Sequence, residues 1–141
     1  MARIKLEIPA RFHFTTEIKV RISDINYGNH LGNDSLVSIL HQARIDFLKN
    51  WSYSEMNIEG VGLIMSDLAV QFKNEAFEGD ILSIEIAAID FGLTSFDLFY
   101  LLTRKSDQKI IAIAKTNMVC YDYHAHKMKD VPEKFRSLFV P

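Results

Sequence analysis

Residues 20–35 read Val-Arg-Ile-Ser-Asp-Ile-Asn-Tyr-Gly-Asn-His-Leu-Gly-Asn-Asp-Ser, and they join two regular patterns. Leading into this stretch, residues 16–22 alternate with Ile18, Val20 and Ile22 on one side, which is the pattern of a half-buried strand. The middle of the stretch is dense in turn-forming residues, so it is expected to be a loop. Because loops held by regular elements often carry binding and catalytic residues, this loop is the first place to look for a site.

A long helix is expected to follow the loop. Asn33, Asp34 and Ser35 are each favourable residues for capping a helix N-terminus. Apolar residues then recur at helical spacing and form one stripe, which consists of Leu36, Ile39, Leu40, Ala43, Phe47 and Leu48. The pattern fails near Asn50, and residues 51–60 are expected to form a short connection.

Four strand-like segments come next, at residues 63–73, 81–89, 94–103 and 109–121. In the first of these, one parity carries Ile64, Leu68, Val70 and Phe72. Pro132 can open a terminal helical turn. One helix cannot cover a five-stranded sheet from both sides, so the sequence predicts an α+β fold in which a curved antiparallel sheet of about five strands wraps around the helix. A second copy of the chain is expected to cover the remaining surface, because symmetric homo-oligomers are common.

The composition sets further bounds. The chain has 141 residues, the length of one ordinary domain, and residues 1–141 are expected to form a single one. Sixteen Lys and Arg against eighteen Asp and Glu give a net charge of −2, so no nucleic-acid partner is expected. No apolar run is long enough for a membrane span, and the first residues lack the apolar run of a signal peptide. The single Cys120 cannot form an intramolecular disulfide, and the expected location is cytoplasmic.

Three motifs give the chain a family resemblance. The first is a strand followed by Asp-x-Asp-x-x-Gly-His-x-Asn-Asn, which corresponds to residues 20–33. The second is Ala-Arg-x-x-Phe-Leu at residues 43–48, and the third is an aromatic residue leading to a Gly-Asp turn at residues 72–80. In this order and spacing they resemble the hotdog-fold thioesterases, specifically the 4-hydroxybenzoyl-CoA thioesterase-like acyl-CoA thioesterases, over residues 14–139.

The resemblance implies a hotdog fold, a homodimer or homotetramer, and active sites that lie between subunits. The substrate would be a thioester of coenzyme A or of an acyl carrier protein, hydrolysed to a free acid and a thiol without a cofactor. The acyl-thioester would enter near the helix N-terminus. His124 and His126 are spaced like metal ligands, but no carboxylate and histidine cluster accompanies them, so no metal site is expected.

Hydrolysis of a thioester needs its carbonyl to be polarised. The first N–H groups of a helix lack partners within the helix, and the helix dipole adds roughly half a positive charge there. A carbonyl oxygen placed against these groups would be stabilised as in an oxyanion hole. The residues expected to bind the substrate are Leu31, Gly32, Asn33, Asp34 and Ser35 at the helix start, with Tyr27 and Phe72 shaping an apolar acyl pocket. The simpler alternative is that Asn33 or Asp34 only caps the helix.

Hydrolysis also needs a base or a nucleophile, and here the sequence departs from the family. The resemblance places a carboxylate at the second Asp of the first motif, but this position is Asn26. An amide can orient a water and cannot take its proton. His30 could act as the base, or could only orient the loop. Asp24 is expected chiefly to accept loop backbone N–H groups, and Asp67 could face a partner subunit, where burial would raise its pKa, or could be a solvated outer residue.

The sequence therefore predicts an acyl-CoA or acyl-carrier-protein thioesterase. In this hypothesis Asn26 orients water or substrate, and His30 or Asp67 assists as the base. The alternative is a non-catalytic protein that binds acyl-thioesters on the same fold, because the usual catalytic Asp is missing.

Overall fold

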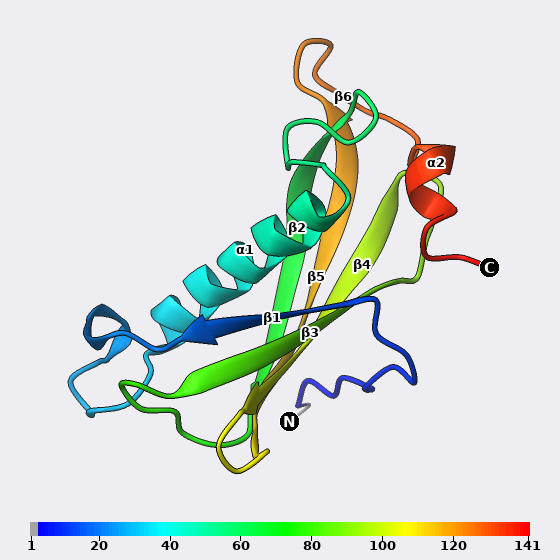
Figure 1. Ribbon diagram of the computed structural model, residues 1–141. Helices are drawn as coiled ribbons and strands as arrows, with labels where there is room; N and C mark the ends of the chain where they lie inside the picture. The colour runs from blue at the N-terminus through cyan, green and yellow to red at the C-terminus, as the bar shows by residue number, and fades with distance from the viewer. Residues whose placement is uncertain (1–2) are drawn as a thin grey trace.

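In the computed structural model, which describes residues 3–141, a curved antiparallel sheet wraps around one long helix (Figure 1). The helices are α1 (Asn33–Asn50), α2 (Glu133–Arg136) and a short 3-10 helix, η1 (Ile22–Asp24). The strands are β1 (Phe14–Lys19), β2 (Gly62–Phe72), β3 (Ile81–Ile89), β4 (Ser95–Arg104), β5 (Ile110–Asp122) and β6 (Lys127–Met128). The sheet order is β1-β3-β4-β5-β2, and β6 pairs with the end of β5. The predicted α+β hotdog fold is confirmed, and the two-residue β6 is an addition to it.

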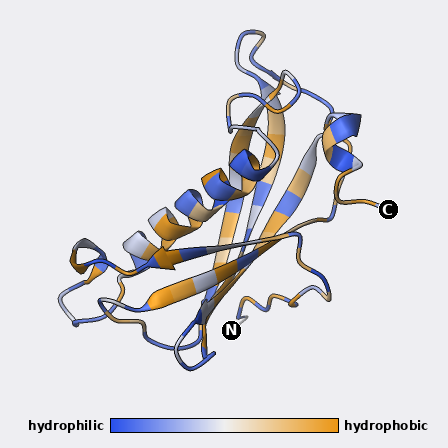
Figure 2. Ribbon diagram, viewed as in Figure 1, coloured by the Kyte–Doolittle hydropathy of each residue, from blue (hydrophilic) through white to orange (hydrophobic). Residues whose placement is uncertain are grey.

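The apolar side of α1 lies against the sheet. All six residues of the predicted stripe are buried, and Phe47 is fully so. Figure 2 shows apolar segments on the strands that α1 covers and alternating polar and apolar segments along α1 itself. Burial of apolar area stabilises a fold by about 25 cal/mol per Å². The helix is therefore held in one position relative to the sheet, and its N-terminus is placed accordingly.

An aromatic cluster closes the end of the core near the C-terminus of α1. The Phe47 ring lies 5.9 Å from Phe14, 5.0 Å from Trp51 and 5.5 Å from Phe139. Phe139 follows α2, whose Phe135 is fully buried. The last residues of the chain thereby pack directly on the central helix.

The outer face of the sheet carries a second, smaller apolar cluster. Ala87, Phe99 and Ile113 are buried there, and Leu6 and Phe12 of the N-terminal segment pack against them. The segment preceding β1 thus covers part of the face that α1 leaves open.

The first strand is shorter than the sequence pattern predicts. β1 ends at Lys19, and Val20 is held by the turn after β2, since its N–H donates to Asp80 O (2.8 Å) and its carbonyl accepts from Gly79 (2.8 Å). The chain then turns into η1, and Ile22 is 75% exposed. The prediction that Ile22 lies on the buried side of a strand is therefore wrong.

The side chains of β2 do not alternate regularly between the two faces of the sheet along its whole length. Its pairing with β5 shifts register between Met65 and Asp67, which is a β-bulge. The bulged Ser66 donates its hydroxyl to Asn117 Oδ1 at 2.6 Å. An inserted residue reverses the direction of the side chains that precede it. Ile64 therefore does not share a face with Leu68, contrary to the prediction.

We expect Phe47→Ala to lower the free energy of unfolding by about 3–5 kcal/mol, because it leaves a cavity at the centre of the aromatic cluster. Urea unfolding followed by circular dichroism measures this. The matched control is Ile22→Ala at an exposed position, which should change stability by less than about 0.5 kcal/mol. Equal effects of the two substitutions would show that the cluster does not hold α1.

Candidate active site

The loop before α1 is anchored by Asp24. This residue is 6% exposed, and its carboxylate accepts the backbone N–H of Arg21 at 2.9 Å. Its carbonyl accepts the N–H of Gly32 at 3.0 Å. Asp24 accepts a backbone N–H as the sequence predicts, and it organises the loop from a buried position.

Asn26 lies at the centre of the loop. Its amide Oδ1 accepts the N–H of Gly28 at 2.9 Å, and its backbone N–H donates to His30 O at 2.9 Å. The Asn26 Nδ2 group makes no hydrogen bond to the residues that the structure describes. Of the two ends of the amide, the nitrogen is thus left as a donor for a ligand, while the oxygen is occupied within the loop.

The tautomer of His30 follows from its contact. Its Nδ1 lies 3.2 Å from Leu31 O, and a carbonyl can only accept, so Nδ1 carries the proton and Nε2 has the free lone pair. A Cβ at Gly28 would lie 3.2 Å from His30 Nε2 and 3.3 Å from Asn26 Oδ1. A larger residue at position 28 would therefore crowd both side chains, and the glycine avoids this.

The N-terminus of α1 has no side-chain cap. The capping position is Gly32, in an extended conformation with φ −76° and ψ 153°, so the prediction that Asn33 or Asp34 caps the helix is wrong. A Cβ at Gly32 would lie 2.8 Å from Asp34 Oδ1, and a glycine at this position avoids that contact. The backbone of Gly32 is fixed by the loop, so a cap is not needed to place the helix start.

The backbone donors at the helix start divide into two groups. The N–H of Leu31 donates to Ala76 O at 2.8 Å, and that of Gly32 donates to Asp24 O, so these two cannot polarise a substrate as expected. The helical hydrogen bonds begin at the Leu36 N–H, which donates to Gly32 O at 3.0 Å. The N–H groups of Asn33, Asp34 and Ser35 make no hydrogen bond to any residue of the described chain. Three adjacent donors are therefore open at the positive end of the helix dipole.

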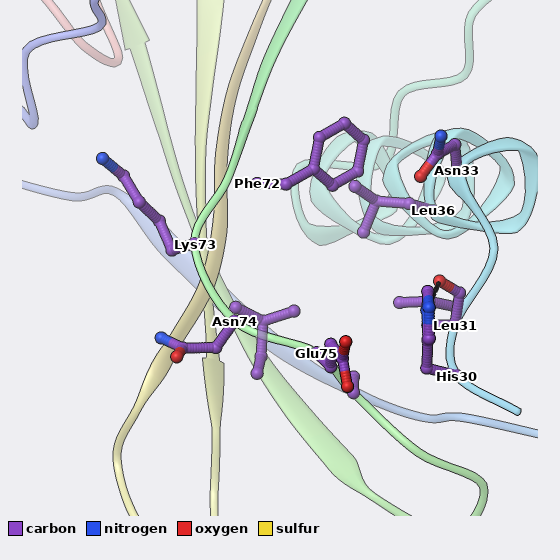
Figure 3. A pocket seen from close by; sticks show the side chains of 10 residues that line it. His30, Leu31, Asn33, Leu36, Phe72, Lys73, Asn74 and Glu75 are labelled. Atoms are coloured by element: carbon purple, nitrogen blue, oxygen red, sulfur yellow. Dashed lines mark hydrogen bonds between the residues drawn. The ribbon is translucent and has the colours of Figure 1, made fainter. Parts of the chain in front are cut away.

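A cavity of about 230 Å³ lies beside these donors (Figure 3). In Figure 3 the Phe72 ring extends from the end of β2 toward α1, where Asn33 and Leu36 lie. The side chains that matter for its chemistry are those of His30, Leu31, Asn33, Leu36, Phe72 and Glu75. The structure thus brings four of the predicted residues, His30, Leu31, Asn33 and Phe72, to one cavity.

Seven predicted residues do not line this cavity, namely Asp24, Asn26, Tyr27, Gly32, Asp34, Ser35 and Asp67. Tyr27 is fully exposed and does not line the cavity of its own chain. Asp67 is exposed on β2, where its carboxylate accepts from Lys115 Nζ at 2.8 Å and from the Asn117 N–H at 3.0 Å. The hydrogen bond from Lys115 lowers the pKa of Asp67. In the single chain Asp67 is therefore the solvated outer residue of the alternative, and a role for it against a partner subunit stays a prediction.

Glu75 was not singled out from the sequence. It lies in the turn after β2 and contributes a carboxylate to the cavity that also holds His30. Its neighbour Ala76 accepts the Leu31 N–H, and this hydrogen bond ties the turn to the loop before α1. Nothing in the local pattern of an acidic turn indicates this, since the contact joins segments more than forty residues apart.

Other reactive groups are inert or absent. Cys120 is 1% exposed, and burial raises the pKa of its thiol to about 11, so the reactive thiolate is scarce near neutral pH. Residues 3–141 hold no group of three or more His, Cys, Asp or Glu side chains that could bind a metal. In the same part of the chain no helix has the length and apolar character needed to cross a membrane.

The chain belongs to the thioesterase-like superfamily, whose family model matches residues 20–139. It is 25% identical over 113 residues to the long-chain acyl-CoA thioesterase FadM of Escherichia coli (strain K12), covering 79% of this chain and 86% of that protein.

Solved structures show the same fold. One is a 1,4-dihydroxy-2-naphthoyl-CoA thioesterase from Synechocystis, with a TM-score of 0.80 and 20% identity, covering 89% of this chain and 93% of the other. A second is a thioesterase-superfamily protein from Jannaschia sp. CCS1, with a TM-score of 0.83 and 20% identity, covering 94% of this chain and 84% of the other. Membership of the family makes thioester hydrolysis the reaction class to be tested against this site.

Proposed function

We propose that the protein hydrolyses acyl thioesters of coenzyme A or of an acyl carrier protein in the cytoplasm. The observation that carries this proposal is the set of three open N–H donors at Asn33, Asp34 and Ser35, beside a cavity that contains His30. The thioester carbonyl oxygen accepts from these donors. Loss of one oxyanion-hole donor typically costs on the order of 10²–10³ in rate, which is the scale of help expected from them.

The proposed reaction uses water as the nucleophile. His30 Nε2 takes a proton from a water, the water oxygen attacks the carbonyl carbon, and the resulting tetrahedral oxyanion is held at the start of α1. The C–S bond then breaks and the thiolate receives the proton from His30, which gives a free acid and a thiol. Asn26 Nδ2 donates to the water or the substrate, and Glu75 stabilises the imidazolium electrostatically.

The relative FadM supports a coenzyme A thioester as the substrate, since its name specifies long-chain acyl-CoA. The alternative function is binding of an acyl-thioester without hydrolysis. It is favoured by one observation: the position of the usual carboxylate is Asn26, whose Oδ1 already accepts the Gly28 N–H.

We further propose that the active form is a homodimer or a tetramer of such dimers. β2 is the last strand in the sheet order, so within residues 3–141 no strand lies beside one edge of this 11-residue strand. Ile64, Met65 and Phe72 are exposed apolar side chains on this strand. Pairing of two β2 edges would cover these side chains and enclose the cavity next to Phe72.

An acyl-CoA panel assayed for release of free thiol tests hydrolysis. We expect turnover above the buffer rate for at least one chain length, and a higher rate for Asn26→Asp, because a carboxylate restores a second proton acceptor. The panel should include short, long and aromatic acyl groups. Tight binding of acyl-CoA by calorimetry with no turnover in either variant would favour the binding protein instead.

Substitutions test whether His30 and Glu75 in the cavity, and not Asp67 outside it, contribute to the reaction. We expect His30→Gln to lower kcat by about 10²–10⁴, since a positioned base is lost. Glu75→Gln should lower it less, because it only removes a charge near the imidazolium. Asp67→Asn is the matched control and should leave kcat within about twofold, because Asp67 is paired with Lys115 outside the cavity. A large loss with Asp67→Asn and none with His30→Gln would overturn the assignment.

Sedimentation velocity tests the assembly. We expect a mass of two or four chains, and we expect Ile64→Lys to produce monomers, because a charge replaces an apolar contact at the β2 edge. Lys19→Glu is the control, since it changes charge at the exposed end of β1. A monomeric wild-type protein would contradict this proposal.

A further inference from the structure

A second cavity follows the first along the seam between α1 and the β2–β5 part of the sheet. It has a volume of about 190 Å³ and is not used by the proposed reaction. Its walls are apolar toward β2, where Met65 and Leu68 meet Val37 and Leu40 of α1. Its polar groups come from Ser38, His41, Arg44 and Thr116.

Arg44 is the unusual member of this cavity, since it is a charged residue only 7% exposed. Its Nε donates to Glu55 Oε2 at 3.0 Å, and its Nη1 donates to the hydroxyl of Tyr100 at 3.1 Å. Its Nη2 makes no hydrogen bond to residues 3–141. No fully buried side-chain nitrogen or oxygen in that range lacks a partner, so Nη2 must retain contact with open space, and Arg44 lines this cavity. A guanidinium donor is therefore available inside it.

The cavity has further hydrogen-bonding groups. The Tyr100 hydroxyl accepts from Arg44 and lies 2.8 Å from Thr116 Oγ1, and either hydroxyl can be the donor in this contact. His41 Nε2 lies 2.7 Å from Glu55 Oε1, and its Nδ1 makes no hydrogen bond to residues 3–141. The Ser38 hydroxyl also lines the cavity. The cavity thus offers the Arg44 donor together with hydroxyl groups that can donate or accept.

This combination fits a neutral hydroxyl better than a carboxylate. Arg44 and Glu55 form an ion pair, so their charges cancel next to the cavity. A second carboxylate would be desolvated beside Glu55 without an unpaired cation to receive it. A hydroxyl both accepts and donates, so it can accept from Arg44 and donate to the Ser38 hydroxyl.

The length of α1 sets how far this site lies from the thioester. Asn33 and His41 are eight residues apart, which is about 12 Å along a helix. An extended chain advances about 1.2 Å per bond, so about ten bonds separate a carbonyl at Asn33 from a group at His41. Of the α1 residues that line the two cavities between these points, Leu36, Val37 and Leu40 are apolar and Ser38 is polar.

We infer that the second cavity binds a hydroxyl group carried about ten bonds from the thioester carbonyl, so that the preferred substrates are medium-chain hydroxyacyl thioesters. The inference rests on the proposed function for the position of the carbonyl. It adds a substrate class that neither the reaction nor the family fixes. Arg44 and Thr116 are its specificity-determining residues.

Non-hydrolysable ligands test this inference separately from catalysis. S-decyl-CoA and S-(10-hydroxydecyl)-CoA are thioethers that differ by one hydroxyl, and calorimetry gives their Kd values. We expect the hydroxylated ligand to bind about tenfold more tightly, which is the scale of one or two hydrogen bonds to the site. Thr116→Val should reduce this preference to about twofold or less. The control Thr15→Val, at an exposed position of β1, should leave it unchanged.

Tyr100→Phe gives a second readout if Thr116→Val fails to fold, because it removes the hydroxyl that links Arg44 to Thr116. Equal Kd values for the two thioethers in the wild-type protein would overturn the inference. A 9-carboxynonyl thioether that binds more tightly than the hydroxydecyl one would also overturn it. A retained hydroxyl preference without hydrolysis of any acyl-CoA would support this site and reject only the proposed reaction.

Discussion

The site depends on how the loop before α1 is anchored to its surroundings. Leu31 donates to Ala76 of the turn after β2, and Gly32 donates to Asp24 of η1. These two hydrogen bonds fix the backbone at the residue where the helix begins, so no side chain is needed to cap it. The next three N–H groups are consequently left open. An uncapped helix start is a cost to stability, and it is at the same time a site where developing negative charge is stabilised.

The sheet turns this local feature into a binding site. Because β2 runs beside α1 in the opposite direction, its end brings Phe72 to the start of the helix, while its beginning brings Met65 to the middle (Figure 1). Two cavities lie between α1 and β2. One is at the start of α1, where the reaction is proposed, and the other is beside Arg44. In the proposed function, the helix supplies the polarising donors and its length sets how long an acyl chain fits.

Local pattern was sufficient to predict the fold. The apolar stripe of α1 and the strand at residues 81–89 follow from spacing alone, and both are confirmed. Local pattern was not sufficient to predict which backbone N–H groups at the start of α1 are free. The Leu31 N–H is occupied by Ala76, which is distant in the chain, and the Gly32 N–H is occupied by the backbone carbonyl of Asp24. Glu75 was missed for the same reason. The pairing of Asp67 with Lys115 could not be predicted either, because Lys115 lies on another strand.

The central claim is that the open N–H groups of α1 polarise the thioester carbonyl. Infrared spectroscopy of a ¹³C-carbonyl acyl-CoA bound to His30→Gln, in which turnover is slow, measures this polarisation as a shift of the C=O stretch. Asn33 is the first helical residue, where proline is well tolerated, so Asn33→Pro removes one donor and preserves the helix. We predict a shift to lower frequency on binding that Asn33→Ala retains and Asn33→Pro diminishes. A carbonyl frequency unchanged by binding, or equally shifted in both variants, would contradict the account.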